Sequence, residues 1–336
     1  MADGKKRANL RDVAAVAGVS VATVSRVLNT PTAVTEKTRE RVQAAIDELR
    51  FVPSAAARAI NSGRTRIVGA LIPTLDNAIF ARFLDAIESQ LAPHQLSLIV
   101  ATTNDDPERE AQKAQHLVDI GAEGLILSGI THSDALYRLI ERVQMPAIAT
   151  SYFDAGYRLP TIGYDNRAAA IMALRHLVDL GHRDIAVLHG PQGNNDRTRA
   201  RIAGLKDAGL PARLSFHETE LSIGGGSATA HDILTAGPAP SAILCLSDVL
   251  ASGASFELRR AGHDVPGRIS LMGIDDLPGS SFLEPPLTTV RLPVRDMGDA
   301  AARALAEWVE QGRVPQSQEL RPALVVRQST GPARDR

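Results

Sequence analysis

The sequence predicts two folds in one chain, a small all-α helix-turn-helix unit followed by a larger α/β unit of two lobes with parallel sheets. Helical periodicity on both sides of a glycine indicates the first fold, and short apolar runs that alternate with helical segments indicate the second. The length of 336 residues exceeds one ordinary core and fits two or three compact units. With 44% hydrophobic and 22% charged residues, the composition is typical of a globular protein.

The first helical pair lies on either side of Gly18. Before it, apolar residues recur with the spacing of one helix face at Leu10, Val13, Ala14 and Ala17. Gly18 suits the left-handed position that ends a helix, and Ser20 can cap the next helix by accepting a backbone N–H. Two short helices joined by so brief a turn cross steeply. This is the helix-turn-helix arrangement, in which the second helix enters the major groove of DNA.

The second helix has two different faces. Val24, Val27 and Leu28 are expected to pack on the first helix, which leaves small, hydroxyl and guanidinium groups on the groove side: Val21, Ala22, Ser25 and Arg26. Arginine can bond guanine bidentately, and small apolar groups can meet a thymine methyl. A third helix should open at Thr35 with an apolar face of Val42, Ala45, Ile46 and Leu49. On geometry alone, a structural helical hairpin without any nucleic-acid role fits this pattern equally well.

Several runs of the chain resemble the headpiece of the lac repressor/gal repressor (LacI/GalR) family of bacterial transcription regulators, namely residues 10–14, 17–20, 23–29 and 38–42. The similarity continues through 51–58 and over almost all of the remaining chain. It implies a DNA-binding headpiece over 1–52, a hinge helix or linker over 53–65 and a periplasmic-binding-protein-like domain for effector binding and dimerisation over 66–336. The N-lobe would comprise about 66–164 and 294–322, and the C-lobe about 165–293 and 323–336.

Charge is distributed unevenly along the chain. The net charge of -1 gives no general affinity for nucleic acid, but residues 1–66 hold twelve Lys and Arg against six Asp and Glu. This excess favours polyanion binding at the N-terminal end. We expect Val21, Ala22 and Arg26 to read bases and Thr23, Asn29 and Thr38 to contact phosphates. Ser25 completes the residues expected to contact DNA in the headpiece.

The segment after Phe51 has a different character. Pro53 breaks the preceding helix, and residues 54–60 are alanine-rich and too short to form a stable helix alone. Composition alone favours a flexible linker. The family resemblance implies instead a hinge helix that folds on the operator, pairs with its dimer mate and pushes Ile60 into the minor groove, with Ala57 beside the groove floor.

From Arg66 onward, strands and helices alternate in two series, which predicts two parallel sheets. The expected strands of the first series are 67–72, 96–101, 124–127 and 147–149, and those of the second are 185–188, one near 216, 242–245 and 269–274. The helices expected between them include 79–91, one after Pro107, 167–180, one from about 197, 227–234 and 251–261. Ligands of such sheets collect beyond the carboxyl ends of the strands.

The loops at those ends carry carboxylates, amides, hydroxyls, an arginine and an aromatic ring, which suit a small polyhydroxylated molecule. Asp and Asn at loop starts are, however, more often helix caps than ligands. The resemblance favours Phe80 as packing aromatic, Arg201 as cleft arginine and Asp275 as effector-facing carboxylate. The full expected effector set is Asp76, Phe80, Ser128, Ser151, Tyr152, Asn195, Arg201, Leu221, Ser247 and Asp275.

Two positions depart from the family pattern. Many members carry Asp-Arg where this chain has Ser151-Tyr152, and Asn-Asp where it has Ser247-Asp248. Loss of a carboxylate and an arginine from the cleft puts the usual sugar specificity in doubt.

No enzyme motif is present. The Gly224–Ser227 run lacks the lysine of a phosphate loop, the nine histidines form no metal-ligand pair at helical spacing, and no elbow motif marks a catalytic serine. We expect no catalytic residue, metal site or cofactor. Cys245 is the lone cysteine, so no disulfide forms within the chain and a buried, inert thiol is expected. No apolar run approaches the ~18 residues of a membrane span, and we expect a cytoplasmic protein.

The sequence thus predicts a sequence-specific DNA-binding transcriptional regulator, a repressor whose affinity for a pseudo-palindromic operator is controlled by a sugar-like or related polar effector. A homodimer is expected rather than a tetramer, because no heptad tail follows Val326. Two other classes stay open. A periplasmic-type binding protein would carry a signal peptide instead of the basic headpiece, and a protein-binding helix-turn-helix would bind with little salt dependence.

Overall fold

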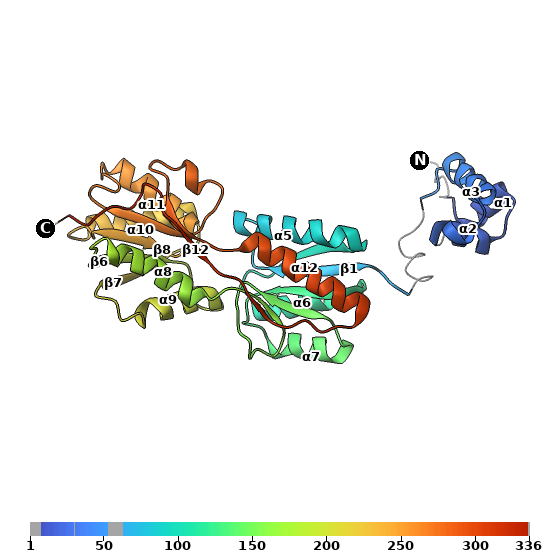
Figure 1. The fold of residues 1–336 in the computed structure, drawn as a ribbon, viewed down its shortest axis with the longest axis horizontal. Helices are drawn as coiled ribbons and strands as arrows, with labels where there is room; N and C mark the ends of the chain where they lie inside the picture. Colours follow the sequence, from blue (N-terminus) through green and yellow to red (C-terminus); the bar gives the residue numbers. More distant parts are fainter. Residues whose placement is uncertain (1–7, 30, 53–62, 335–336) are drawn as a thin grey trace, which may run out of the picture. The chain divides into compact units, whose positions relative to one another are not determined.

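The computed structural model describes residues 8–29, 31–52 and 63–334. The chain divides into two compact units, Met1–Arg66 and Ile67–Arg336. Both units are shown in Figure 1.

The first unit is a three-helix bundle. Its elements are α1 (Leu10–Ala17), α2 (Val21–Asn29), the 3₁₀ turn η1 (Pro31–Ala33) and α3 (Glu36–Glu48). Asn9 caps α1 in a reciprocal pair with Asp12, and Gly18 ends it with a left-handed φ of 61°. The Ser20 hydroxyl accepts the Thr23 N–H at 3.1 Å at the start of α2, as expected. Apolar side chains from the three helices form one core, centred on Val13, Val24, Val27, Val42 and Ala45.

The N-lobe of the second unit has a six-stranded sheet of order β11-β5-β4-β3-β1-β2, in which the paired strands are parallel. Its strands are β1 (Ile67–Ile72), β2 (Ser97–Thr102), β3 (Ala122–Ser128), β4 (Ala147–Thr150), β5 (Thr161–Gly163) and β11 (Gln318–Glu319). Helices cover both faces. Figure 1 shows α5 (Ala78–Leu91) beside α12 (Val294–Gln311) on one face, and α6 (Pro107–Asp119) and α7 (Asp134–Val143) pack on the other. The 3₁₀ turn η2 (Ala92–His94) follows α5.

The C-lobe has a second six-stranded sheet of order β12-β10-β9-β8-β6-β7, with β12 antiparallel to β10. Its strands are β6 (Asp184–His189), β7 (Arg213–Glu218), β8 (Ala242–Cys245), β9 (Ser270–Asp275), β10 (Thr288–Arg291) and β12 (Ala323–Val325). Around them pack α8 (Asn166–Asp179), α9 (Asp196–Lys206), α10 (Ile223–Thr235), α11 (Asp248–Arg260) and the turn η3 (Ser280–Phe282). The predicted fold class, a helix-turn-helix unit and a two-lobed α/β unit, is confirmed.

Three chain segments connect the two lobes within residues 67–334. They are the links from β5 to α8, from β10 to α12 and from β11 to β12. The carboxyl ends of β1, β6, β8 and β9 therefore lie near the junction of the lobes, where loops from both sheets meet. That junction holds the cavity.

Candidate functional site

A cavity of about 100 Å³ lies between the two lobes of the Ile67–Arg336 unit. Its walls come from loops that follow strands of both sheets and from the first turns of α5 and α9. The apolar wall includes Ile79, Phe80, Phe83, Leu221, Leu246 and Val294. The polar wall includes Thr74, Asn77, Asp105, Ser151, Asn195, Arg197, Arg201, Ser247 and Asp275. An apolar face opposite a few fixed polar groups is typical of a small-molecule site.

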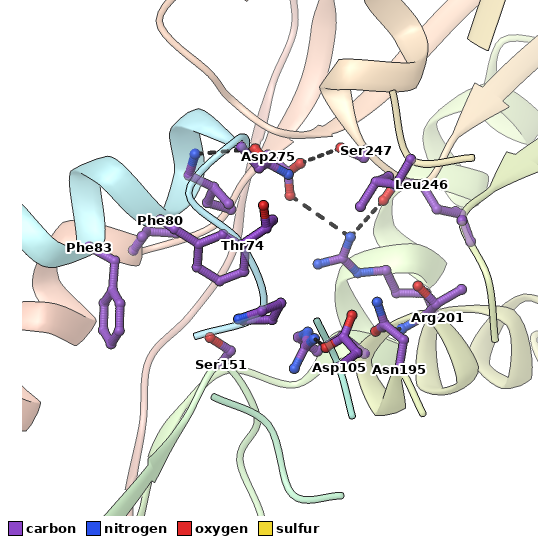
Figure 2. A pocket seen from close by; sticks show the side chains of 18 of the residues that line it. Thr74, Phe80, Phe83, Asp105, Ser151, Asn195, Arg201, Leu246, Ser247 and Asp275 are labelled. Carbon is purple, nitrogen blue, oxygen red and sulfur yellow. Dashed lines mark hydrogen bonds and ion pairs between the residues drawn. The ribbon is translucent and has the colours of Figure 1, made fainter. Parts of the chain in front are cut away.

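Arg201 organises the polar wall. Its Nε donates to Asn166 Oδ1 at 3.0 Å, and its Nη1 donates to the carbonyl oxygen of Leu246 at 2.6 Å. The same Nη1 lies 3.8 Å from Asp275 Oδ1. Figure 2 shows this guanidinium and the Asp275 carboxylate on one side of the cavity, with Phe80 opposite. The arginine is thus held in place by other groups of the protein.

Asp275 stands at the end of β9 and is 5% exposed. Its Oδ2 accepts the Ser247 hydroxyl at 2.8 Å. Burial raises the pKa of Asp275 to about 7; the positive charge of Arg201 opposes this rise, and the negative charge of Asp248 adds to it. The backbone φ of 130° is rare for a residue with a side chain. Such strain at the end of a strand is often associated with a functional site.

The loop after β9 is held by a second carboxylate, Asp248, at the start of α11. Its Oδ2 accepts from the Leu277 N–H at 3.0 Å and the Ser280 hydroxyl at 2.5 Å, and its Oδ1 accepts from Thr289 Oγ1 at 2.7 Å. Asp248 is fully buried, and burial raises its pKa. These bonds position the loop that follows Asp275, so Asp248 supports the site without lining the cavity.

A second arginine, Arg197, lines the cavity; it lies in the arginine segment that resembles the family's cleft, but the resemblance favours Arg201 over it as the effector-binding residue. Arg197 is 9% exposed, and its Nη2 donates to Asp105 Oδ1 at 2.9 Å. Burial acts to lower the pKa of Arg197, but the negative charges of Asp196 and Asp105 have the larger effect and raise that pKa. The available signal was its spacing, because Arg197 precedes Arg201 by one helical turn and so shares its face of α9.

Seven of the ten residues expected to bind effector line the cavity: Phe80, Ser151, Asn195, Arg201, Leu221, Ser247 and Asp275. Asp76, Ser128 and Tyr152 do not. Asp76 is exposed in the loop before α5, whose N-cap, Asn77, lines the cavity instead.

Ser128 and Tyr152 do not line the cavity because of the local geometry of β3 and of the loop after β4. Strand alternation places Ser128 with Ile126 on the α5/α12 face, where its hydroxyl is buried. Tyr152 follows a lining residue and is partly exposed. Burial raises its pKa, and the charges of Asp196 and Asp165 raise it further. Both side chains therefore lie beside the cavity wall and not in it.

The candidate DNA-facing surface lies on α2 in the first unit. Val21, Ala22 and Arg26 are exposed, whereas Thr23 and Ser25 are partly exposed. Asn29 is the last residue of the helix. Thr23 shares a hydrogen bond with Ser20 at 2.9 Å.

Two residues of α3, Thr38 and Arg41, make side-chain hydrogen bonds in this unit. Thr38 shares a hydrogen bond with Thr35 at 3.0 Å, and the Thr35 side chain, expected to cap α3, makes no capping bond. Arg41 donates to the carbonyl oxygens of Ala17 and Gly18 at 2.6 and 3.2 Å, which ties α3 to the turn before α2. Ala57 and Ile60 lie outside the described residues.

Among the described residues, no group of three or more His, Cys, Asp or Glu side chains is arranged to hold a metal ion. In the same part of the chain, no helix has the length and apolar character needed to cross a membrane. Cys245 is buried, and burial raises the pKa of its thiol.

The chain is similar to known proteins over nearly its whole length. Residues 9–54 match the model for bacterial regulatory proteins, lacI family, and residues 174–330 match the periplasmic binding protein-like domain. The HTH-type transcriptional regulator reg1 of Streptomyces lividans is 36% identical, and the alignment covers 96% of this chain and 97% of that protein. The HTH-type transcriptional regulator MalR of Streptomyces coelicolor is 35% identical, with the same coverage.

Solved structures agree with the sequence relatives. The crystal structure of the Lac repressor dimer bound to operator and the anti-inducer ONPF has a TM-score of 0.87 and 28% identity. The match covers 97% of this chain and 100% of that one. The similarity therefore includes the helical unit and both lobes.

Proposed function

The chain belongs to the lacI family of bacterial regulatory proteins, and on that premise we propose that it is a repressor that binds a pseudo-palindromic operator as a homodimer. A small polar molecule, sugar-like in its chemistry, binds between the lobes and sets the operator affinity. The domain boundaries follow as 1–52 for the headpiece, 53–65 for the hinge and 66–336 for effector binding and dimerisation. The relatives are transcriptional regulators, and we assign this chain no catalytic activity and a cytoplasmic location, where its operator lies.

The lining of the cavity supports a small polar effector. The Arg201 guanidinium, the Asp275 carboxylate and the Asn195 amide come from one lobe, while Phe80 comes from the other. Donors and acceptors fixed in this way suit the hydroxyls of a sugar, and an aromatic face suits its apolar ring side. Because the lining comes from both lobes, a bound molecule contacts both and can change their relative orientation. Serines at 151 and 247 shorten two wall positions relative to many family members, which favours a ligand other than the family's usual sugars.

The exposed face of α2 supports a role in DNA binding. Arg26, Val21 and Ala22 read base edges, and Thr23, Ser25, Asn29 and Thr38 hold the phosphates or the adjoining groove wall. Ala57 and Ile60 act in the hinge against the minor groove. The solved Lac repressor is a dimer on its operator, and the same arrangement here places two copies of α2 on two half-sites. Coupling between cavity and operator is expected to be worth ~1–3 kcal/mol.

Selection from a random DNA pool with the purified full-length protein tests the proposal. Enrichment of a palindrome supports the dimeric regulator, and the recovered site then allows pools of sugars and nucleosides to be screened for release by fluorescence anisotropy. A co-repressed protein would enrich the palindrome only when such a pool is present. Absence of enrichment in every pool, or binding that changes little between low and high salt, contradicts the proposal.

A further inference from the structure

Beside the cavity, the N-terminus of α9 contacts a loop of the opposite lobe. The loop is Gly129–Thr131, which follows β3. Asp196 Oδ2 accepts from the backbone N–H of Ile130 at 2.5 Å and from that of Thr131 at 2.9 Å. Asp196 is 6% exposed, so these charge-assisted bonds are made with little water around them. They join the C-lobe to the N-lobe.

Two arginines of α9 add to the same junction. Arg197 donates from Nη2 to Asp105 Oδ1 at 2.9 Å, and its Nη1 lies 3.3 Å from Asp196 Oδ1. Arg199 donates from Nη2 to Thr131 Oγ1 at 2.8 Å. Within four residues, α9 therefore supplies three side chains that contact the other lobe.

The fit of the loop against α9 depends on glycine. Gly129 has a φ of 85°, and a Cβ added there would lie 2.5 Å from both Asp196 Oδ2 and Arg197 Nη1. Such distances are well inside van der Waals contact. A side chain at 129 would thus displace the Asp196 carboxylate and the Arg197 guanidinium from their contacts with the loop, and the backbone there would be strained.

The loop is held from its own lobe as well. The Tyr157 hydroxyl donates to the carbonyl oxygen of Ile130 at 2.9 Å. His132 Nδ1 lies 2.6 Å from Glu110 Oε2, and both side chains are almost wholly buried. These contacts keep the N–H groups of Ile130 and Thr131 in place to receive Asp196, so little ordering is needed when the lobes meet.

From these contacts we propose that Asp105, Gly129–Thr131, Asp196, Arg197 and Arg199 form an interlobe latch that stabilises the closed arrangement of the lobes through the protein's own side chains. Burying a carboxylate and a guanidinium costs desolvation that their mutual contacts largely offset. The latch therefore biases the lobe equilibrium without locking it. Asp105 and Arg197 also line the cavity, so a molecule bound there meets the latch directly. Because these contacts join the lobes directly, the latch acts whatever the identity of the effector.

The test measures the distance between the lobes in the full-length protein without added ligand. Spin labels are placed on cysteines substituted at Gln112 on α6 and Lys206 on α9, both exposed. Cys245 is buried and stays unlabelled. Double electron–electron resonance then gives the populations of short and long interlobe distances. The short distance should dominate in the protein that carries only the label sites.

Asp196→Asn is the main variant, because an amide cannot accept from both backbone N–H groups and from Arg197. It should lower the closed-to-open ratio by roughly tenfold or more, because hydrogen bonds to a charged group are lost. Asp134→Asn is its matched control, since Asp134 is also the first residue of a helix, α7, and is exposed within the N-lobe. Gly129→Ala acts from the other lobe without removing a charge and should shift the ratio in the same direction.

Three results would overturn the latch. The first is an unchanged distance distribution in folded Asp196→Asn. The second is an equal shift in Asp134→Asn, which would indicate a general loss of helix capping charge. The third is a long distance that already dominates before any substitution. Should Asp196→Asn fail to fold, Gly129→Ala decides: a shift to the long distance supports the latch, and an unchanged distribution refutes it.

Discussion

The buried carboxyl of Asp275 should make the stability of the lobes depend on pH, and Asp275→Asn should remove that dependence. Burial raises its pKa to about 7, against an ordinary value of 3.8. Because the folded-state pKa is the higher one, the folded protein keeps a proton that the unfolded chain has released. The contribution of Asp275 to the free energy of unfolding therefore falls as pH rises through this window and is smallest above pH 7.

The magnitude follows from the size of the shift. Each pH unit inside the window is worth ~1.4 kcal/mol. Between pH 5 and pH 8, the protein should lose about 3 kcal/mol relative to the asparagine variant, which cannot ionise. Asparagine has nearly the same shape and still offers an oxygen to the Ser247 hydroxyl, so the two proteins should differ least at pH 5.

Urea unfolding at a series of pH values measures this difference. Trp308 is the only tryptophan and packs on the N-lobe core, which makes its fluorescence a suitable probe. Asp276→Asn is the control. Burial raises the pKa of Asp276, but hydrogen bonds from Arg291 and Arg327 outweigh it and lower that pKa. This control should be less stable by an amount that is constant from pH 5 to pH 8. An equally constant gap for Asp275→Asn would refute the reasoning.

Three further substitutions test other parts of the molecule. Arg26→Ala should remove ~1–3 kcal/mol of discrimination at one base pair, measured on single-base operator variants, and an equal loss on every sequence would contradict its reading role. Gly18→Ala should destabilise the first unit by about 1–2 kcal/mol in thermal unfolding, since φ is 61° and a Cβ would lie 2.8 Å from Arg41 Nη2; an unchanged melting temperature would argue against it. Phe80→Ala should weaken the effector found by screening by about 1.5–3 kcal/mol in calorimetry, and unaltered affinity would place the ligand elsewhere.

Local patterns were sufficient to predict much of the fold. The bounds of α1 and β1 agree with the predicted ranges, because each is a periodic or continuous apolar run closed by Gly18 or Pro73. The family resemblance that rests on the headpiece residues is confirmed. By contrast, β5 and β11 have three and two residues and offer no readable period. Their pairing depends on neighbours brought together by the rest of the lobe.

The cavity shows where sequence reasoning ends. Phe80 and Asp275 could be placed because each lies in a motif that resembles the family's, Phe80 in the first turn of α5 and Asp275 at the end of β9. The bridge between Asp105 and Arg197 joins residues 92 positions apart in different lobes, and nothing local to either residue signals it. Likewise, the sequence placed Asp76 in the correct loop, but which loop side chain turns inward depends on the backbone, and Asn77 does so instead. The roles of these residues in binding stay predictions.

The three chain segments that connect the lobes also determine the order in which the two lobes can fold during synthesis. Neither sheet is a continuous stretch of sequence. The N-lobe is complete only after α12 and β11 have been synthesised, and the C-lobe only after β12 at Ala323–Val325. During synthesis, the core of the Met1–Arg66 unit is complete early, whereas β5 and β10 each lack one strand partner until β11 and β12 have emerged. Unpaired edges are prone to aggregation, so slow translation or a truncated C-terminus should affect effector binding and solubility before it affects the fold of the headpiece.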